Sequence, residues 1–71
     1  MIWNNPTNTP KNNMEIVFQT YNGNVKIGIY KDEKIIDSHK NEYKMYQIKQ
    51  WLKLDDWLNY FQTKKIKNKQ R

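Results

Sequence analysis

The C-terminal end of the chain carries the densest group of charged side chains in the sequence. The group consists of Lys64, Lys65, Lys67, Lys69 and Arg71. Such a run attracts phosphates. Each phosphate that it neutralises makes the binding constant fall more steeply with salt: the slope of log K against log salt concentration, which we call the salt slope, grows in magnitude by about 0.9 for a duplex and about 0.7 for a single strand. The alternative is that these cations favour the C-terminal end of a helix and keep the protein in solution. The sequence leaves both interpretations open.

Aromatic side chains that lie beside lysines can add base stacking to a basic surface, at about 1–3 kcal/mol per base. The candidates are Tyr21, Tyr30, Tyr43, Tyr46 and Tyr60. Any single tyrosine also has a structural alternative, because a chain of 71 residues needs most of its aromatic rings for its core. We expect Lys44 and Tyr60 to join the C-terminal cations in a surface for a partner or a nucleic acid.

Residues that can catalyse a reaction are scarce. His39 is the single histidine and there is no cysteine, so one chain cannot form a histidine pair or a Cys-His dyad. The carboxylate pairs Asp32-Glu33 and Asp55-Asp56 are expected in a turn and at a helix start. Gly23 and Gly28 belong to a hairpin rather than to a phosphate loop. We therefore expect a protein that is not an enzyme and that uses no metal and no cofactor.

The length of the chain limits the core that positions these side chains. A domain of this size buries only about 60% of its unfolded surface, and a stability of about 3–5 kcal/mol is typical. With three Trp, five Tyr and two Phe, the core must rely on aromatic rings. A homodimer would add buried surface, so a monomer and a homodimer both remain open. The lack of cysteine and of long apolar runs predicts a cytoplasmic protein without a membrane partner.

The N-terminal segment 1–13 has the composition of a loop, with two Pro, five Asn and two Thr around Trp3. We expect an irregular arm that Trp3 anchors, and the alternative is a flexible arm that exposes this ring. Residues 14–31 form two β-rich runs around Asn22-Gly23, a pair that favours a two-residue type I′ hairpin turn. A second turn at Asp32-Glu33 would return 34–37 as a third strand, which places Ile36 beside Ile29 on the apolar face.

The expected turn also predicts the register of the hairpin. The pairs on its apolar face are Thr20 with Val25, Phe18 with Ile27 and Ile16 with Ile29. The pairs on its mixed face are Gln19 with Lys26, Val17 with Gly28 and Glu15 with Tyr30. One apolar and one mixed face are typical of a sheet that covers a core on one side.

The second half of the chain is expected to end in a helix. Leu54, Trp57, Leu58 and Phe61 follow the helical spacing, so we predict an amphipathic helix from about residue 55 to 65. Periodicity does not decide whether 43–52 is a strand or a helix. The expected architecture is α+β: an antiparallel sheet of three or four strands packed against the helix, in a single domain 1–66 with a basic tail 67–71.

Several residues follow the pattern of a known family. They are Trp3, Pro10, Ile16-Val17-Phe18, Gly23, Gly28-Ile29-Tyr30 and 48–54. The chain resembles a family of short phage and prophage proteins known as domain of unknown function five hundred and fifty-one. It departs from that family in a shorter Trp-to-Pro spacing, and in Lys53-Leu54-Asp55 where the family has a Pro-Leu-Pro ending. The resemblance implies that 48–52 is a strand with a packed Trp and that the protein comes from a mobile element.

These observations lead to an expected function. We expect a non-catalytic phage or mobile-element protein that inhibits a host defence factor, in the manner of an anti-CRISPR protein, by binding a protein or nucleoprotein complex in the host cytoplasm. The alternative is an accessory protein that binds RNA or DNA directly through its basic C-terminus. A homo-oligomeric scaffold is a third possibility.

Overall fold

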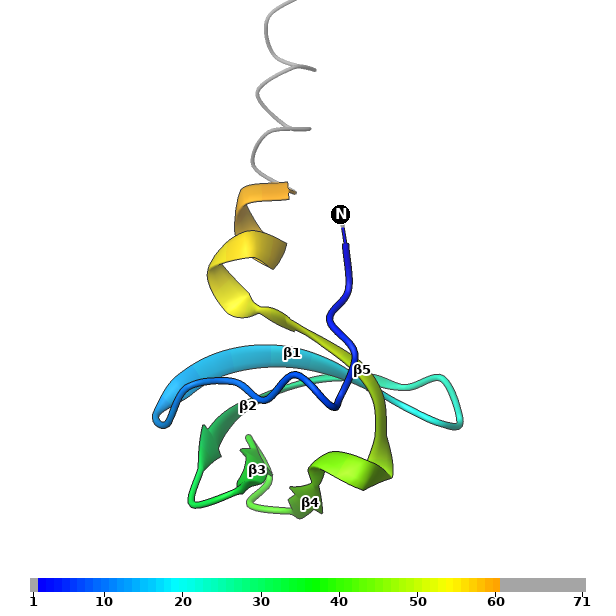
Figure 1. Ribbon diagram of the computed structural model, residues 1–71, viewed down its shortest axis with the longest axis vertical. Coiled ribbons are helices and arrows are strands. Elements are labelled where there is room, and N and C mark those ends of the chain that lie inside the picture. Colours follow the sequence, from blue (N-terminus) through cyan, green and yellow to red (C-terminus); the bar gives the residue numbers. More distant parts are fainter. Residues whose placement is uncertain (1, 61–71) are drawn as a thin grey trace, which may run out of the picture.

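The structure, a computed structural model, describes residues 2–60. Its centre is one antiparallel sheet in the order β4-β3-β2-β1-β5. The elements are β1 Met14–Thr20, β2 Val25–Lys31, β3 Lys34–Asp37, β4 Glu42–Lys44, a 3-10 turn η1 Met45–Gln47, and β5 Ile48–Lys53. The sheet is curled, and residues 54–60 continue from β5 as a helix (Figure 1). The predicted α+β architecture is confirmed, with five strands instead of three or four.

The β1–β2 hairpin forms at the predicted place, but its turn is one residue longer than predicted. The Thr20 N–H donates to the Asn24 carbonyl at 2.9 Å, and the Gly23 N–H donates to the Thr20 carbonyl at 3.0 Å. The loop therefore holds residues 21–23, and Gly23 alone supplies the positive φ, 93°. The Thr20 hydroxyl bonds the Asn22 side-chain oxygen and supports this turn. Such a three-residue loop, a turn followed by a left-handed glycine, is the common alternative to the type I′ turn.

The longer turn shifts the register of the hairpin by one residue. Phe18 lies opposite Lys26 and Ile16 lies opposite Gly28, so all six predicted pairs are wrong. Because side chains alternate between the two faces of a strand, a shift of one residue exchanges the faces of β2. Tyr30, which we expected on the mixed face, therefore points into the core with only 7% of its surface exposed.

The core lies inside the curl of the sheet. Its buried members are Ile16, Phe18, Tyr30, Ile35, Ile48 and Trp51. The rings of Phe18 and Tyr43 pack with their centroids 5.1 Å apart. Gly28 lets β2 and β3 approach closely here, because a Cβ on this residue would lie 2.6 Å from the Ile36 carbonyl oxygen. Aromatic rings and one glycine thus allow a short chain to enclose a packed core.

The segment that follows β2 agrees with most of its predictions. The third strand has the predicted bounds, Lys34–Asp37, and Ile36 pairs with Ile29 as predicted. The predicted apolar face for this pair is wrong, because Ile29 is 42% exposed and the neighbouring Ile35 is the buried isoleucine of the strand. Asp32 and Glu33 both have positive φ, 52° and 65°, as a type I′ turn requires. The undecided residues 43–52 divide into the end of β4, the η1 turn and most of β5. The strand that the family resemblance implies for 48–52 is therefore confirmed.

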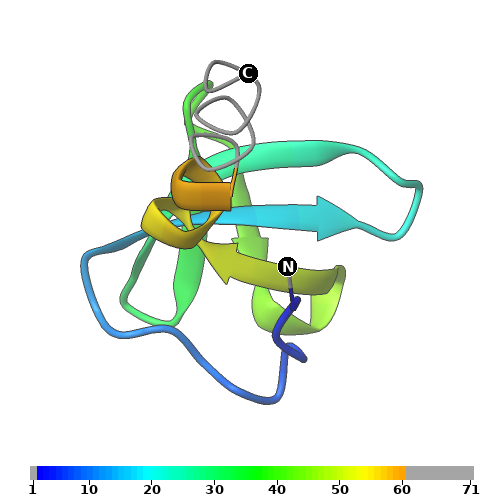
Figure 2. The same cartoon turned by 90° about the horizontal axis from the view of Figure 1, so that it is seen from above.

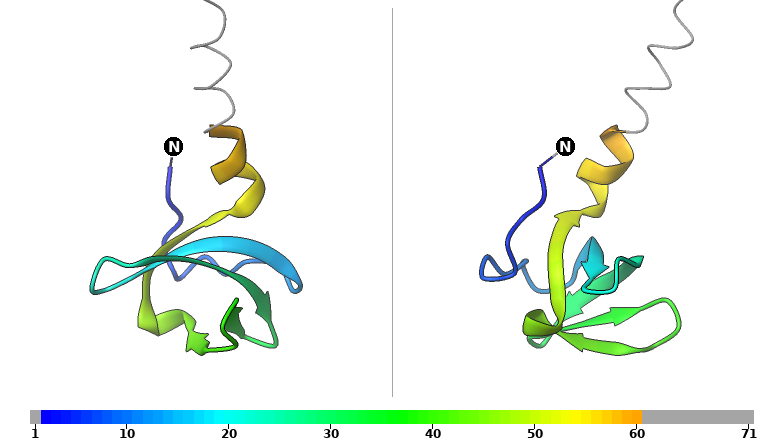
Figure 3. Two further views of the ribbon diagram at one scale, coloured as in Figure 1. Left: turned by 180° about the vertical axis from the view of Figure 1, so that it is seen from behind. Right: turned by 90° about the vertical axis from the view of Figure 1, so that its right-hand side faces the viewer.

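The N-terminal arm and the helix meet above the outer face of the sheet. The ring of Trp3 lies edge-on to Trp57, with the centroids 5.8 Å apart. Asn4 pairs with Trp51 in β5 through two backbone hydrogen bonds of 2.7 and 3.0 Å. Figure 2 shows the arm looping around one side of the sheet before it enters β1, and the helix rises beside the start of the arm (Figure 3).

The described part of the helix covers residues 54–60. The rest of the predicted helix, the predicted domain end at 66 and the tail lie outside the described residues. Leu58, on the predicted apolar stripe, remains 46% exposed. Within residues 2–60, no helix has the length and apolar character that crossing a membrane requires.

Candidate nucleic-acid interface

Two of the seven predicted site residues lie within the described part of the chain. The other five, Lys64, Lys65, Lys67, Lys69 and Arg71, lie outside it. Lys44 is exposed in β4, and Tyr60 is partly exposed near the upper end of the described helix. Figure 1 places β4 and this helix at opposite ends of the fold, so Lys44 and Tyr60 do not form one surface.

The net charge of +6 is not spread over the described residues. Residues 2–60 contain eight lysines and all seven acidic residues, which nearly balance each other. A local surface that attracts anions must therefore come from the placement of individual lysines, because the overall charge of this region is small.

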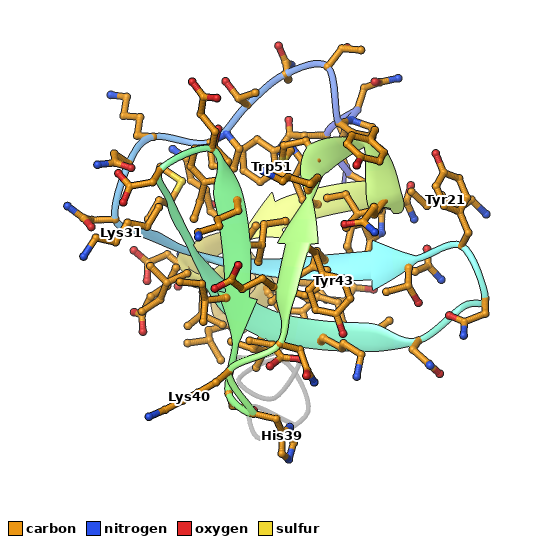
Figure 4. The ribbon with its side chains drawn as sticks, turned by 90° about the horizontal axis from the view of Figure 1, so that it is seen from below. Tyr21, Lys31, His39, Lys40, Tyr43 and Trp51 are labelled. Carbon is orange, nitrogen blue, oxygen red and sulfur yellow. The ribbon has the colours of Figure 1, made fainter. Side chains whose placement is uncertain are left out.

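The structure separates the tyrosines into core and surface residues. Tyr30 is buried, and Tyr43 is half-buried against Phe18. In contrast, Tyr21 is 69% exposed at the tip of the β1–β2 hairpin, and Tyr46 is 77% exposed in η1. In Figure 4 the side chain of Tyr21 points away from the sheet, whereas Tyr43 lies over its middle. Rings with this exposure are available for stacking.

Three open hollows follow one another along the surface that carries these two rings. The first, of about 440 Å³, contains Lys26, and the second, of about 590 Å³, contains Lys49. The third, of about 430 Å³, contains Lys44. Tyr21 lines both the first and the second hollow, and Tyr46 lines both the second and the third. We call these two tyrosines and three lysines the tyrosine track.

Local hydrogen bonds fix the backbone that carries the two rings of the tyrosine track. Tyr21 is the first residue of the hydrogen-bonded turn between Thr20 and Gly23. Tyr46 is the middle residue of η1, where the Gln47 side-chain oxygen accepts the Lys44 N–H at 2.7 Å. Both rings therefore project from short, well-bonded backbone segments, which reduces the entropy lost when a ligand packs on them.

A β-bulge determines where Lys49 lies. Gln19 of β1 pairs with Gln50 of β5, but the next residue, Thr20, pairs with Ile48, so Lys49 is the extra residue of β5. A bulge of this kind turns a side chain away from the regular alternation of its strand. Neither Lys49 nor its link to Tyr21 and Tyr46 was predicted, because a bulge leaves no periodic signal in the sequence.

The carboxylate of Asp37 organises the loop between β3 and β4. Its Oδ1 atom accepts the backbone N–H groups of His39 and Asn41, both at 2.9 Å. Its Oδ2 atom accepts the Asn41 amide and the Tyr43 hydroxyl, both at 3.4 Å. Burial raises the pKa of Asp37, but the hydrogen bonds from Asn41 and His39 outweigh this effect, so the pKa lies below its ordinary value.

Replacement of Asp37 by asparagine should destabilise the protein at neutral pH. The amide nitrogen that replaces one carboxylate oxygen cannot accept hydrogen bonds from Asn41 and Tyr43, and the bonds to the remaining oxygen lose the negative charge that strengthens them. A lowered pKa in the folded state means that the ionised carboxylate stabilises the fold above the unfolded pKa of about 3.9, and that this stabilisation is lost as the pH falls through the folded pKa. The difference between wild type and Asp37→Asn should therefore shrink in acid. Urea unfolding at neutral pH and at about pH 3 tests this; an equal difference at both values would contradict it.

The histidine and the second carboxylate pair lie at the surface of the described part of the chain. His39 is exposed in the β3–β4 loop. Asp55 and Asp56 are exposed at the start of the helix. Within residues 2–60, no three His, Cys, Asp or Glu side chains are grouped so that they could hold a metal ion. Comparison with known proteins finds no matching family model, curated protein or solved structure.

Proposed function

We propose that this protein is a small, non-catalytic binding protein that contacts the nucleic acid of its partner. The single observation that carries the proposal is the tyrosine track, in which exposed aromatic rings alternate with lysines along one surface. Rings that stack on bases beside cations that neutralise phosphates are the standard means by which proteins hold nucleic acid strands. The C-terminal cations would add a second, sequence-independent attraction.

The partner that we favour is a nucleoprotein complex of a host defence system, which the protein would inhibit by occupying its nucleic-acid channel. The resemblance to a phage and prophage family and the small size of the chain support this choice. The alternative is an accessory protein that binds free RNA or DNA in phage replication or regulation. The tyrosine track supports contact with nucleic acid in either case.

Affinity capture from a bacterial host lysate, with and without nuclease, tests the proposal. We expect nucleic acid to be recovered with the full-length protein, and we expect nuclease to remove it. Tight capture of a host complex together with weak binding to free oligonucleotides favours the inhibitor. Submicromolar binding to free oligonucleotides favours the accessory protein. Recovery of the same proteins after nuclease, with no nucleic acid in the untreated sample, would contradict the proposal.

A variant with the five C-terminal cations replaced by glutamine measures their share of the binding. If all five contact phosphates of a single strand, the replacement should lower the salt slope by about 3.5. An unchanged slope would assign these residues to solubility alone. Lys40→Gln is the matched control, because Lys40 is an exposed lysine in the β3–β4 loop, outside the tyrosine track.

A further inference from the structure

We infer that the nucleic acid held by the tyrosine track is single-stranded, with one base on Tyr21, one base on Tyr46 and the phosphates beside Lys26, Lys49 and Lys44. This inference rests on the proposed function and specifies the class of ligand. It concerns the described residues and does not depend on the basic residues beyond them.

The alternation along the track determines the class of ligand. Each tyrosine forms the wall between two hollows, and each hollow contains one lysine. A ring in this position can stack on a base only when that base is not stacked on the adjacent bases of its own strand. In a duplex the bases are stacked inside the helix, whereas the unstacked bases of a single strand can spread onto aromatic rings.

The polar lining of the hollows suits the edges of bases. The side chains of Asn22 and Asn24 line the first hollow, and Asn5 and Thr7 line the second. The Thr7 hydroxyl donates to the Asn5 side-chain oxygen at 2.9 Å, so a base would meet the Asn5 amide N–H groups and the Thr7 hydroxyl oxygen. Amides and hydroxyls both donate and accept hydrogen bonds. No acidic residue lines the first two hollows, and Glu33 in the third lies in a hollow that also contains Lys44.

A row of lysines extends the track at its third hollow. Lys34 of β3 lies directly opposite Lys31 of β2 and directly opposite Lys44 of β4, so the three side chains share one face of the sheet. Glu42 pairs with Lys34 at 3.2 Å and neutralises one of the three. Lys31 and Lys44, which do not take part in this ion pair, can attract an anion to this end of the track.

Fluorescence anisotropy with a labelled single strand, and with the duplex of the same sequence, tests the inference on the full-length protein. We expect the single strand to bind more tightly than the duplex. The double variant Tyr21→Ala/Tyr46→Ala should lose about 5- to 140-fold in affinity for the single strand for each base that it no longer stacks. Its salt slope should stay unchanged, because no cation is removed.

Matched variants separate stacking from a general disturbance of the surface. The double variant Tyr21→Phe/Tyr46→Phe keeps both rings and should recover the affinity that the alanine pair loses. Lys49→Gln should lower the salt slope by about 0.7, which corresponds to one phosphate of a single strand. Lys40→Gln, outside the track, should leave affinity and slope at wild-type values. Circular dichroism verifies that each variant is folded.

Three outcomes would overturn the inference. Wild-type affinity in the alanine pair, together with loss of binding when the five C-terminal cations are replaced, would assign nucleic-acid binding to the C-terminus and leave the proposed function standing. Equal or tighter binding of the duplex would contradict the single-strand assignment. Failure of the wild-type protein to bind any oligonucleotide would also overturn the inference. The capture experiment with and without nuclease would then test the proposed function independently.

Discussion

Replacement of Phe18 by alanine is expected to leave most of the chain unfolded in the absence of denaturant. Phe18 is fully buried at the centre of β1, between β2 and β5, and its ring packs against Tyr43. Removal of a buried phenylalanine ring costs about 3–5 kcal/mol, because apolar contacts are lost and a cavity remains. A domain of this size has about 3–5 kcal/mol of stability in total. The substitution therefore removes nearly all of it.

Thermal unfolding followed by circular dichroism measures this effect. Phe18→Leu is the matched control: it keeps an apolar side chain of related volume, and it should cost less than about 1.5 kcal/mol and still unfold cooperatively. Val25→Ala is a second control on the same hairpin, at a residue that is half-exposed, and it should change the stability by less than about 1 kcal/mol. A cooperative transition of Phe18→Ala near the wild-type temperature would contradict the burial of Phe18 in the core.

Replacement of Trp51 by alanine should have an effect of similar size and should also release the N-terminal arm. Trp51 is buried in the core from β5, and its indole N–H donates to the Asn8 carbonyl at 2.6 Å. Its backbone pairs with Asn4. Loss of the ring should cost about 3–5 kcal/mol. The arm would lose the side chain that holds its middle, so the wall that Asn5 and Thr7 contribute to the second hollow would become mobile.

Trp51→Phe separates the two contributions of this residue. The phenyl ring keeps much of the core contact but cannot donate the hydrogen bond, so we expect a total loss of about 1–2 kcal/mol, of which the bond itself contributes about 0.5–1.5 kcal/mol. Trp51→Phe should stay folded and keep the protection of the Asn4 N–H in amide hydrogen exchange, whereas Trp51→Ala should exchange this amide rapidly together with the amides of the strands. Equal protection of this amide in both variants would mean that the arm is held independently of the indole.

These two core substitutions also show why the aromatic residues must be treated separately. Phe18 and Trp51 serve the core, and their loss unfolds the protein whatever it binds. Tyr21 and Tyr46 project into solvent, so their replacement should change the unfolding free energy little. Variants in the tyrosine track therefore test binding without the loss of folded protein that core variants would cause.

The local sequence determined most of the secondary structure. The Asn22-Gly23 pair locates the β1–β2 turn, and alternation of apolar residues marks the strands on both sides of it. Asp32-Glu33 locates the second turn, and the third strand therefore has the bounds predicted from the sequence. These features depend on interactions between residues near each other in the chain, which is why sequence patterns reveal them.

Only the tertiary structure decided which side chains face the core and which face a partner. The choice between a two-residue and a three-residue loop at Gly23 shifts every later side chain of the hairpin to the other face, and the dipeptide allows both. The bulge at Lys49 and the short η1 turn are too brief to leave a periodic pattern. Tyr21 and Tyr46 are 25 positions apart in the sequence, and they line one hollow because β1 pairs with β5, which places Thr20 opposite Ile48. That proximity depends on long-range strand pairing, which no local pattern encodes.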